Sequence, residues 1–406
     1  MRRNSILTVF GTRPEIIKLA PLMLALERHH RSVRTINVCS GQHEELLYPF
    51  VDFFDVRMDY DLRLKADGQG RTELLERIVL GLSEIIAAEK PNLLVVQGDT
   101  TTALAGAIAG SQCGVPVAHV EAGLRSGNLR SPYPEEAYRI AITRMASIHF
   151  AATERNKQTL RREGVSDKAI FVTGNPIVDT LQMVLRERAL STDSNAELQK
   201  VIGDRKCIIL TTHRRESFGP VLSDNLRVIR AFVERHEEVV VVFPVHPNPN
   251  VQTPAHEILG GHPRIFLIQP LAYFDFVQLV SKSWLVVSDS GGIQEEVPSL
   301  GKPLLILREN TERPECIDAG VAKLAGGRPG TLRTMLEEAC LPDSWVNFVG
   351  KIENPFGCGD SGGRIANHIA SLLRAERPRR TDSGRFIPTN YMDSLNADAQ
   401  IQRTPQ

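Results

Sequence analysis

Short runs of apolar, mostly β-branched residues alternate along the chain with stretches in which apolar residues recur every three or four positions. The first pattern is typical of buried strands and the second of amphipathic helices. Nine strands are predicted on this basis, at 6–10, 93–96, 117–120, 148–151, 207–210, 239–243, 265–268, 284–287 and 304–307. Strands that alternate with helices in this way favour parallel sheets covered by helices, an α/β fold.

Two helical stretches in the first half show the expected apolar face. One face consists of Ile16, Leu19, Ala20, Met23 and Leu26, and the other of Leu75, Ile78, Val79, Leu82 and Ile85. Because each face repeats with the helical period, both helices are predicted to cover a sheet.

The alternation pauses between about residues 190 and 205, where the sequence is polar and rich in turn formers. Two doubly wound domains are therefore predicted, at 1–188 and 206–363, joined by a linker at 189–205. A last helix is expected at 364–375. Residues 376–406 contain few apolar side chains and are predicted to form a disordered tail, to which we assign no function.

The composition agrees with two globular domains, since 42% of the 406 residues are hydrophobic. Lysine and arginine balance aspartate and glutamate at 48 each, and no basic stripe indicates a nucleic-acid partner. Neither a signal peptide nor an 18-residue apolar run is found, so no membrane partner is expected. The six cysteines form no C-x-x-C pair, which argues against a disulfide framework and structural zinc and favours a cytoplasmic location.

A candidate phosphate site follows the predicted strand at 284–287. Ser290, Gly291 and Gly292 come directly after this strand, at the start of a predicted helix. Unpaired amides at a helix N-terminus attract anions, and glycine allows phosphate oxygens to approach the backbone. Glu296, one turn further on, is within reach of a ribose hydroxyl. The alternative reading is a simple Gly-Gly turn.

Carboxylates follow three of the predicted elements in the first half of the chain. Asp99 follows one strand, Glu121 follows the next, and Glu135 lies shortly beyond it. Ligands of open parallel sheets collect at the carboxyl ends of strands, so these groups are candidates for acid-base catalysis. The alternative for Asp99 is a helix cap. Arg13 and Lys18 add two cations after the first strand.

The second half places further polar residues after its strands. His213 stands beside Arg214 and Arg215, a combination that suits a phosphate or a proton, although a single histidine can also be structural. Arg313 is a second anion-binding candidate, and its alternative is a surface ion pair with Glu312 or Glu315.

Three short motifs fail the test of context. Residues 359–363 copy a string found around the serine of trypsin-like proteases, but an alternating α/β chain excludes that fold. The glycines at 357, 359 and 362 spell a dinucleotide pattern without a preceding strand. His256 lacks the second histidine of a zincin helix. We therefore expect no metal and no cofactor.

Six ordered motifs together resemble the bacterial non-hydrolysing UDP-N-acetylglucosamine 2-epimerases, and the resemblance covers about residues 5–372. The motifs are Gly11–Glu15, Gln97–Thr100, His119–Arg125, Pro134–Glu136, Thr212–Glu216 and Asp289–Glu296. The resemblance implies two Rossmann-like doubly wound domains of the GT-B-like type with an interdomain cleft, and a final helix that crosses back to the first domain.

The resemblance also implies roles for individual residues. Asp99, Glu121, Glu135 and His213 match the catalytic set of the family. A further group would bind UDP or the substrate, namely Arg13, Lys18, Leu271, Phe276, Ser290, Gly291, Gly292, Glu296 and Arg313. Gln42 and His43 match part of a site at which substrate acts as an allosteric activator in some members.

The implied reaction is reversible C2 epimerisation of UDP-N-acetylglucosamine to UDP-N-acetylmannosamine, by elimination and re-addition of UDP through a 2-acetamidoglucal intermediate. One base and one acid are needed on opposite faces of the sugar. At least one of Asp99, Glu121 and Glu135 is expected to be the base and another the acid, without assignment between them. His213 is expected to stabilise the diphosphate. The family further implies a homodimer and a role in making precursors of cell-surface polysaccharides.

Three departures from the family pattern leave alternatives open. Tyr138 stands where a small amide is common, Phe356 and Cys358 alter a C-terminal motif, and Gly68 replaces an arginine that some members carry in the activator site. The alternatives are an epimerase, including a hydrolysing one, that acts on another UDP-acetamido sugar, a GT-B glycosyltransferase, and a UDP-sugar-binding sensor without catalysis.

Overall fold

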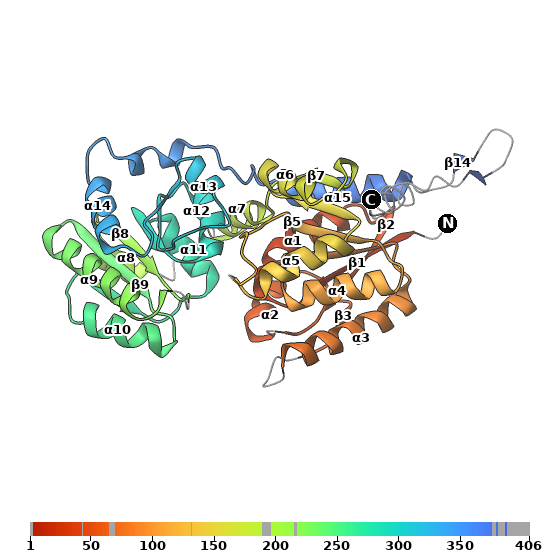
Figure 1. The fold of residues 1–406 in the computed structure, drawn as a ribbon, viewed down its shortest axis with the longest axis horizontal. Helices are drawn as coiled ribbons and strands as arrows, with labels where there is room; N and C mark the ends of the chain where they lie inside the picture. Colours follow the sequence, from red (N-terminus) through yellow and green to blue (C-terminus); the bar gives the residue numbers. More distant parts are fainter. Residues whose placement is uncertain are drawn as a thin grey trace, which may run out of the picture. The chain divides into compact units, whose positions relative to one another are not determined.

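A computed structural model describes residues 3–42, 44–64, 70–130, 132–188, 196–214, 217–375, 379–380 and 386–387. The chain forms two compact units, one built from Met1–Thr180 and Phe356–Gln406 and the other from Leu181–Pro355. The chain thus leaves the first unit, completes the second and then returns to the first (Figure 1). The predicted boundaries at 188 and 364 lie a little later in the chain than these two points.

The first unit is built on a seven-stranded parallel sheet with the strand order β3-β2-β1-β4-β5-β6-β7. Its strands are β1 (Asn4–Phe10), β2 (Val33–Cys39), β3 (Tyr60–Asp61), β4 (Leu93–Gln97), β5 (Val117–Ala122), β6 (Ile148–Ala151) and β7 (Ile170–Val172). Its helices are α1 (Arg13–Glu27), α2 (Glu44–Phe53), α3 (Arg71–Glu89), α4 (Thr101–Gln112), α5 (Glu135–Met145), α6 (Glu154–Arg162) and α15 (Ser361–Ala375), with a 3₁₀ turn at Asp167–Ala169. Helix α7 (Ile177–Arg188) begins in the first unit and continues into the second, because the division falls between Thr180 and Leu181.

The two predicted apolar faces lie in α1 and α3. All five of the α1 positions are buried, whereas Leu75 and Val79 of α3 are only partly buried and pack at the edge of the core. Both helices therefore cover the sheet, as their apolar spacing predicts.

Helix α15 packs against α1, although the two lie at opposite ends of the sequence. The Asp179 carboxylate accepts hydrogen bonds from the Ser361 and Gly362 amides, at 3.1 and 3.0 Å, which fixes the start of α15. A Cβ atom on Gly362 would lie 2.6 Å from the carbonyl carbon of Pro21, so the close approach of the two helices requires glycine there. At the other end of α15, Asn4 Nδ2 donates to the Leu373 carbonyl at 2.8 Å.

The second unit is built on a six-stranded parallel sheet with the order β10-β9-β8-β11-β12-β13. Its strands are β8 (Lys206–Thr211), β9 (Val239–Pro244), β10 (Ile265–Ile268), β11 (Leu285–Ser288), β12 (Leu304–Ile306) and β13 (Ala322–Leu324). Its helices are α8 (Ala196–Ile202), α9 (Pro220–Arg235), α10 (Pro249–Leu259), α11 (Tyr273–Ser281), α12 (Gly291–Leu300), α13 (Glu315–Asp318) and α14 (Pro329–Ala339), with 3₁₀ turns at Trp345–Asn347 and Val349–Lys351.

The predicted fold class is confirmed, since two parallel α/β sheets are present and every one of the nine predicted strands is found. Four strands of these two sheets were not predicted, namely β2, β3, β7 and β13. Helix α8 occupies part of the segment predicted as a linker. Within the predicted tail, only β14 (Arg379–Arg380) and β15 (Phe386–Ile387) are described, and they pair antiparallel; the rest of the predicted tail lies outside the described residues.

The strand orders define where ligands are expected. In each sheet the chain first adds strands on one side of the initial strand and then crosses to its other side, which makes β1 a neighbour of β4 and β8 a neighbour of β11. At such switch points the loops after neighbouring strands diverge, and the carboxyl ends of the strands become accessible.

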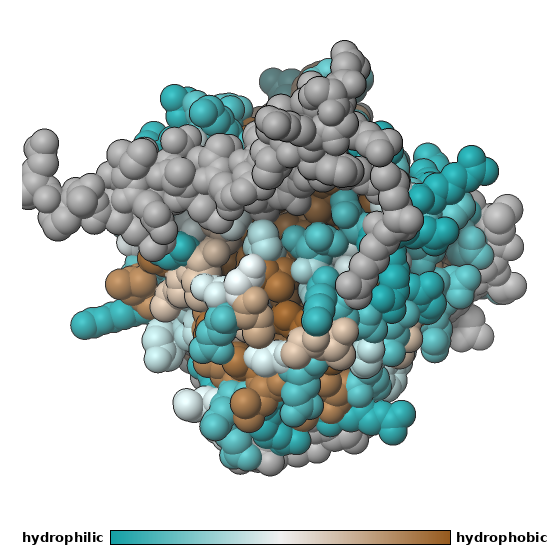
Figure 2. Space-filling model, turned by 90° about the vertical axis from the view of Figure 1, so that its right-hand side faces the viewer, coloured by the Kyte–Doolittle hydropathy of each residue, from teal (hydrophilic) through white to brown (hydrophobic). Residues whose placement is uncertain are grey.

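The outer surface is mixed in character. Figure 2 shows apolar side chains gathered toward the middle of one face, with hydrophilic side chains around them. Among the described helices, none combines the length and apolar character needed to cross a bilayer.

Candidate active site

Glu121 is the most constrained carboxylate of the first unit. It lies in β5 with φ at 67°, where the register with β6 shifts between Val120 and Ala122. Its two oxygens each accept a hydrogen bond from Lys18 Nζ at 2.7 Å, and one of them also accepts from Gln97 Nε2. Left-handed backbone at a bulky residue is strained and is typical of functional sites. The bulge therefore holds a carboxylate and a cation together beside the switch point.

Asp99 follows β4 and is paired with an arginine from α5. Arg139 Nε donates to Asp99 Oδ2 at 2.7 Å, and Arg139 Nη2 lies 2.6 Å from the same oxygen. Arg139 Nη1 also donates to buried Glu136, at 3.0 Å. This arginine therefore fixes the position of α5 relative to the end of β4.

Glu135, the first residue of α5, has a different environment. Its Oε2 atom is buried and has no hydrogen-bond partner among the described residues. A buried carboxylate oxygen without a donor retains a lone pair for a proton or a ligand. Glu135 thus differs from Asp99 and Glu121, whose charges are matched by Arg139 and Lys18.

The loop after β1 is organised by Glu15, which is fully buried. Its Oε2 accepts from the Gly11 and Thr12 amides at 3.0 and 2.8 Å, and its Oε1 accepts from the Thr100 hydroxyl at 2.7 Å. Burial raises the pKa of Glu15 to about 7, although these hydrogen bonds act in the opposite direction. One side chain therefore ties the loop after β1 to the loop after β4.

The remaining candidates of the first unit lie near these loops. Arg13 is exposed at the first position of α1. Gln42 accepts a hydrogen bond from the Thr102 hydroxyl at 3.1 Å, so it contacts the first turn of α4. His43, predicted beside it, lies outside the described residues, as does Gly68.

In the second unit, Asp289 connects the loops after β8 and β11. Its buried carboxylate accepts from the Thr212 hydroxyl at 2.7 Å and from the amides of His213 and Arg214. His213 Nδ1 lies 3.4 Å from Asp289 Oδ1, and its ring stacks on that of His246 with 5.9 Å between centroids. The His213 side chain is 42% exposed, so it remains accessible to a ligand. Arg215 is outside the described residues.

Two guanidinium groups converge on the start of α12. A Cβ atom on Gly291 would lie 3.0 Å from Arg313 Nη1 and 3.1 Å from Arg214 Nη2. Ser290 is the N-cap residue, and its side chain makes no capping hydrogen bond within the described structure. Two arginines thus lie beside the first amides of the helix, which include that of Gly292. This arrangement fits a diphosphate.

Buried carboxylates hold Arg313 in this position. Arg313 Nε donates to Glu295 at 2.5 Å, and Arg313 Nη1 lies 3.4 Å from Glu312. Glu312 also pairs with Arg308 at 2.9 Å. Burial would raise the pKa of Glu312, but the two arginines outweigh it and lower that pKa to about 2. The alternative reading of Arg313 is correct about the ion pair with Glu312 but wrong about its location, because both side chains are buried.

Glu296 lies one turn into α12 and accepts a hydrogen bond from the Tyr273 hydroxyl at 3.1 Å. This contact joins α12 to α11, which contains Phe276. Leu271 precedes α11, and both it and Phe276 are half-buried. The predicted contacts of Glu296 with ribose and of Leu271 and Phe276 with uracil remain predictions.

The structure groups the predicted residues within each unit. Lys18, Asp99, Glu121 and Glu135 lie on the loops and first turns at one edge of the first sheet, and His213, Gly291 and Arg313 lie together in the second unit. From the sequence, Arg214 was named only as a neighbour of His213 in a combination that suits a phosphate or a proton, and Arg139 was not identified. The sequence did offer one indication of both residues, because each is a basic residue close to the acidic residues of a motif.

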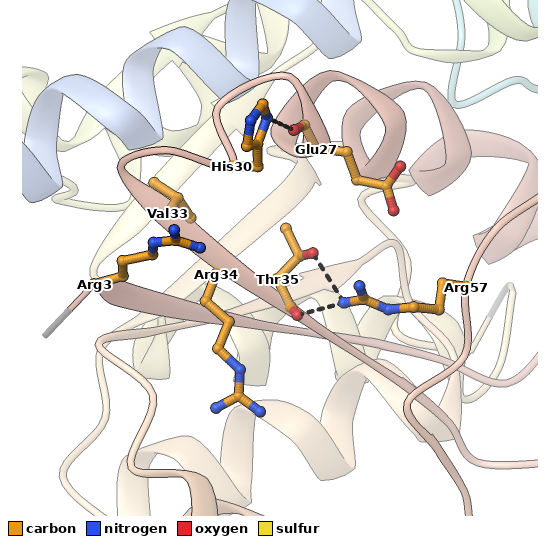
Figure 3. Close-up of a pocket in the computed structure, with 7 residues that line it drawn as sticks. All are labelled: Arg3, Glu27, His30, Val33, Arg34, Thr35 and Arg57. Carbon is orange, nitrogen blue, oxygen red and sulfur yellow. Dashed lines mark hydrogen bonds between the residues drawn. The ribbon is translucent and has the colours of Figure 1, made fainter.

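A separate pocket lies elsewhere in the first unit and is lined by Arg3, Glu27, His30, Val33, Arg34, Thr35 and Arg57 (Figure 3). Arg57 Nη2 donates to the Thr35 carbonyl at 2.9 Å, and Arg34 pairs with Glu89 at 2.6 Å. Arg34 and Arg57 at its wall are thus engaged in structural contacts, and no predicted site residue lines this pocket.

Comparisons with known proteins agree with this geometry. A family model described as UDP-N-acetylglucosamine 2-epimerase matches residues 25–370. The UDP-N-acetylglucosamine 2-epimerase of Salmonella typhimurium (strain LT2) is 43% identical over 371 residues, which cover 90% of this chain and 98% of that protein.

Solved structures are similar over the same length. The crystal structure of UDP-GlcNAc 2-epimerase from Neisseria meningitidis bound to UDP-GlcNAc matches with a TM-score of 0.84 and 37% identity, covering 90% of this chain and 100% of that one. The enzyme from Methanocaldococcus jannaschii in complex with UDP-GlcNAc and UDP matches with a TM-score of 0.76 and 32% identity, covering 90% and 99%.

Proposed function

Because the chain belongs to the UDP-N-acetylglucosamine 2-epimerase family, we propose that it interconverts UDP-N-acetylglucosamine and UDP-N-acetylmannosamine without net hydrolysis. A proton leaves C2 of the sugar, and UDP leaves C1 with the bonding electron pair. The product of this elimination is 2-acetamidoglucal. UDP then adds back at C1, and a proton returns to C2 on the opposite face, which inverts that carbon.

The observation that carries the proposal is the set of carboxylates and cations at one edge of the first sheet. The C2 proton is weakly acidic because no carbonyl is adjacent to C2, so its removal needs a fixed base and a departing leaving group. Asp99 and Glu121 are each held by a cation, and Glu135 has a buried oxygen without a donor among the described residues. We assign proton removal and proton return to members of this trio.

The second unit supplies the features expected for the leaving group. Arg214, Arg313 and the first amides of α12 surround Gly291 and would neutralise the charge that develops on the departing diphosphate. His213 is fixed beside them by Asp289. Relatives with UDP-GlcNAc bound support the choice of this nucleotide sugar.

Incubation with UDP-N-acetylglucosamine in heavy water tests the proposal. Proton NMR should show deuterium entering at C2 while a UDP-N-acetylmannosamine signal grows. Release of free N-acetylmannosamine together with UDP would instead identify a hydrolysing enzyme. If neither exchange nor product appears, UDP-N-acetylglucosamine is not the substrate and other UDP-acetamido sugars should be assayed.

Substitutions separate the chemistry from nucleotide binding. Asp99→Asn and Glu121→Gln should abolish turnover and leave the UDP dissociation constant nearly unchanged, because most of the residues expected to bind UDP, such as Gly291 and Arg313, lie in the second unit. Glu338→Gln, which changes a surface carboxylate paired with Lys323, is the matched control and should keep full activity. Wild-type turnover in either site variant would contradict the assignment.

Three further parts of the proposal rest on the family resemblance, and the cytoplasmic location rests on the cysteine pattern. We propose that the product enters synthesis of cell-surface polysaccharide precursors in the cytoplasm, that the enzyme is a homodimer, and that substrate also acts as an activator. The apolar area in Figure 2 is the kind of surface that supports self-association. Gln42 contacts the first turn of α4, which follows directly on Asp99, and this supports coupling of an activator to the catalytic loop.

A further inference from the structure

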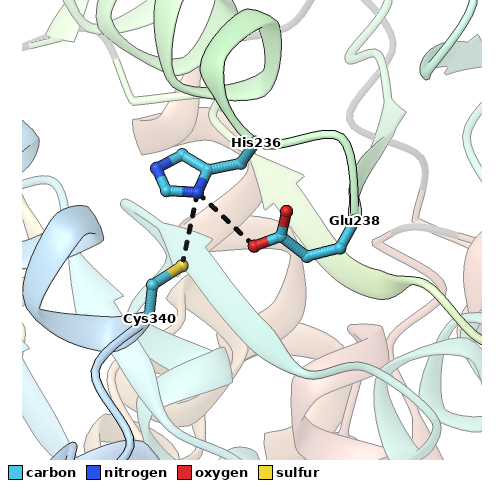
Figure 4. A group of neighbouring side chains, drawn as sticks. All are labelled: His236, Glu238 and Cys340. Carbon is cyan, nitrogen blue, oxygen red and sulfur yellow. Dashed lines mark hydrogen bonds and ion pairs between the residues drawn. The ribbon is translucent and has the colours of Figure 1, made fainter.

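Three side chains of different chemistry meet at one edge of the second unit. His236 is the residue that ends α9, Glu238 immediately precedes β9, and Cys340 ends α14. One ligand atom from each lies within 4.8 Å of the others (Figure 4). We propose that these residues bind a divalent metal ion and that Zn²⁺ is the ion they fit best, a site that is independent of the proposed epimerase activity.

A fourth residue fixes the tautomer of the histidine. His236 Nε2 lies 2.9 Å from Glu337 Oε2, and a carboxylate can only accept, so Nε2 carries the proton. Arg235 pairs with the same carboxylate at 2.6 Å and holds it in place. In a neutral ring, Nδ1 then has a lone pair. A carboxylate behind a histidine is the usual second partner of a metal-bound imidazole, because it orients the ring and strengthens the ligand.

This lone pair points toward two further ligands. Glu238 Oε1 lies 3.4 Å and Cys340 Sγ 4.0 Å from His236 Nδ1. Zinc bonds of about 2.0 Å to nitrogen and oxygen and about 2.3 Å to sulfur, in a tetrahedron, would separate nitrogen from oxygen by about 3.3 Å and nitrogen from sulfur by about 3.5 Å. The two separations from His236 Nδ1 therefore need to shorten by only about half an ångström or less, and water can take the fourth position.

Without a metal, the same groups have a less favourable arrangement. A carboxylate oxygen and an imidazole lone pair repel each other at 3.4 Å unless the ring is protonated on both nitrogens. Binding forms a sulfur–zinc bond, breaks the S–H bond and releases the proton to solvent.

Two positively charged side chains lie near the proposed metal site and oppose the binding of a metal ion. Lys206 Nζ lies 3.9 Å from Glu238 Oε1 and 5.1 Å above the Trp284 ring, and Arg264 Nη1 contacts the His236 carbonyl. Lys206 thus competes for the carboxylate. The Lys206→Met substitution removes this positive charge and should strengthen metal binding. If the cluster had only a structural role, the substitution would remove the ion pair with Glu238 without creating any metal affinity.

A metal ion at this site would link two parts of the second unit that are far apart in the sequence. Cys340 is more than a hundred residues from His236, and the ion would join the end of α14 to the connection between α9 and β9. For this reason the spacing of residues along the sequence, which has no C-x-x-C pair, gave no indication of zinc at this place.

The test uses the full-length protein without an affinity tag, freed of metal by a chelator and titrated with ZnCl₂ in the presence of a chromophoric competitor. One equivalent per chain should bind. Cys340→Ser should abolish this binding, and Glu337→Gln should weaken it by about tenfold or more. Cys358→Ser removes an exposed cysteine outside the cluster and should bind like the wild type.

A second measurement does not depend on the folding of variants. Cobalt added to the metal-free wild type should give the charge-transfer absorption of one thiolate bound to Co²⁺, with a d–d spectrum of tetrahedral geometry. The proposal is overturned if the wild type binds no zinc, if Cys340→Ser binds as well as the wild type, or if cobalt shows no thiolate band. The cluster is then an imidazolium held between Glu238 and Glu337.

Discussion

Replacing Glu15 with glutamine should change how the stability of the first unit depends on pH. Glu15 is fully buried, and its pKa is raised to about 7 chiefly because burial disfavours the charged form. A glutamine oxygen can still accept from Gly11 and Thr12, and its NH₂ group can donate to the Thr100 hydroxyl. The variant therefore keeps the hydrogen bonds of the loop but cannot titrate.

The sign and size of the effect follow from linkage. The pKa rises from 4.5 to about 7 on folding, so at intermediate pH the folded chain holds a proton that the unfolded chain has released. The free energy of unfolding of the wild type therefore falls as pH rises through this range. A shift of roughly 2.5 units corresponds to about 3 kcal/mol. Relative to the wild type, Glu15→Gln should gain stability of this order between pH 4.5 and 8.

Urea unfolding of both proteins between pH 5 and 8 measures this difference. The buried histidines His119 and His149, with pKa values lowered to about 4 and 3, add a pH dependence of their own, but it is common to both proteins and cancels. Both tryptophans lie in the second unit, so tryptophan fluorescence serves as an internal reference that should not change, while circular dichroism follows both units. A difference that stays constant within about 0.5 kcal/mol, or one of opposite sign, would refute the argument.

One further substitution tests the contacts of Arg313, and a pair of glycine substitutions tests the backbone of the loop after β5. Glu295→Gln removes the charge of the closest partner of Arg313 and should raise the UDP dissociation constant by about tenfold or more in calorimetry. Gly123→Ala should destabilise the first unit by about 2 kcal/mol or more in urea unfolding, because φ is 86° and the new Cβ would lie 2.3 Å from the Asn156 carbonyl oxygen. Gly127→Ala, also left-handed but in open space, should cost about 1 kcal/mol, and equal effects in the two alanine variants would contradict the steric argument.

The strands that sequence reasoning found differ physically from those that it missed. The predicted strands are continuous apolar runs buried on both faces, such as β9, whose residues Val239 to Phe243 are fully buried. Strand β2 escaped prediction because Arg34, Thr35 and Asn37 interrupt its apolar pattern. Strands β3, β7 and β13 have two or three residues each and lie at sheet edges, where pairing with one neighbour suffices.

The candidate site was predictable only in part. The rule that polar residues collect after parallel strands selected Asp99 and Glu121 from the sequence. Their partners could not be found in this way, because the pairs with Arg139 and Lys18 depend on the strand order and on how helices pack over it. The convergence of Arg214 on Gly291 likewise requires the loops after β8 and β11 to be neighbours.

The return of α15 to the first unit sets an order of events during synthesis on the ribosome. Residues 181–355 form a continuous unit and can fold as soon as they have left the exit tunnel. The first unit, although made earlier, lacks its α15 layer over α1 until Ser361–Ala375 have been translated. Its nascent form therefore exposes an apolar helix surface while the whole second unit is being made, and chaperones that recognise such surfaces have their longest access to α1.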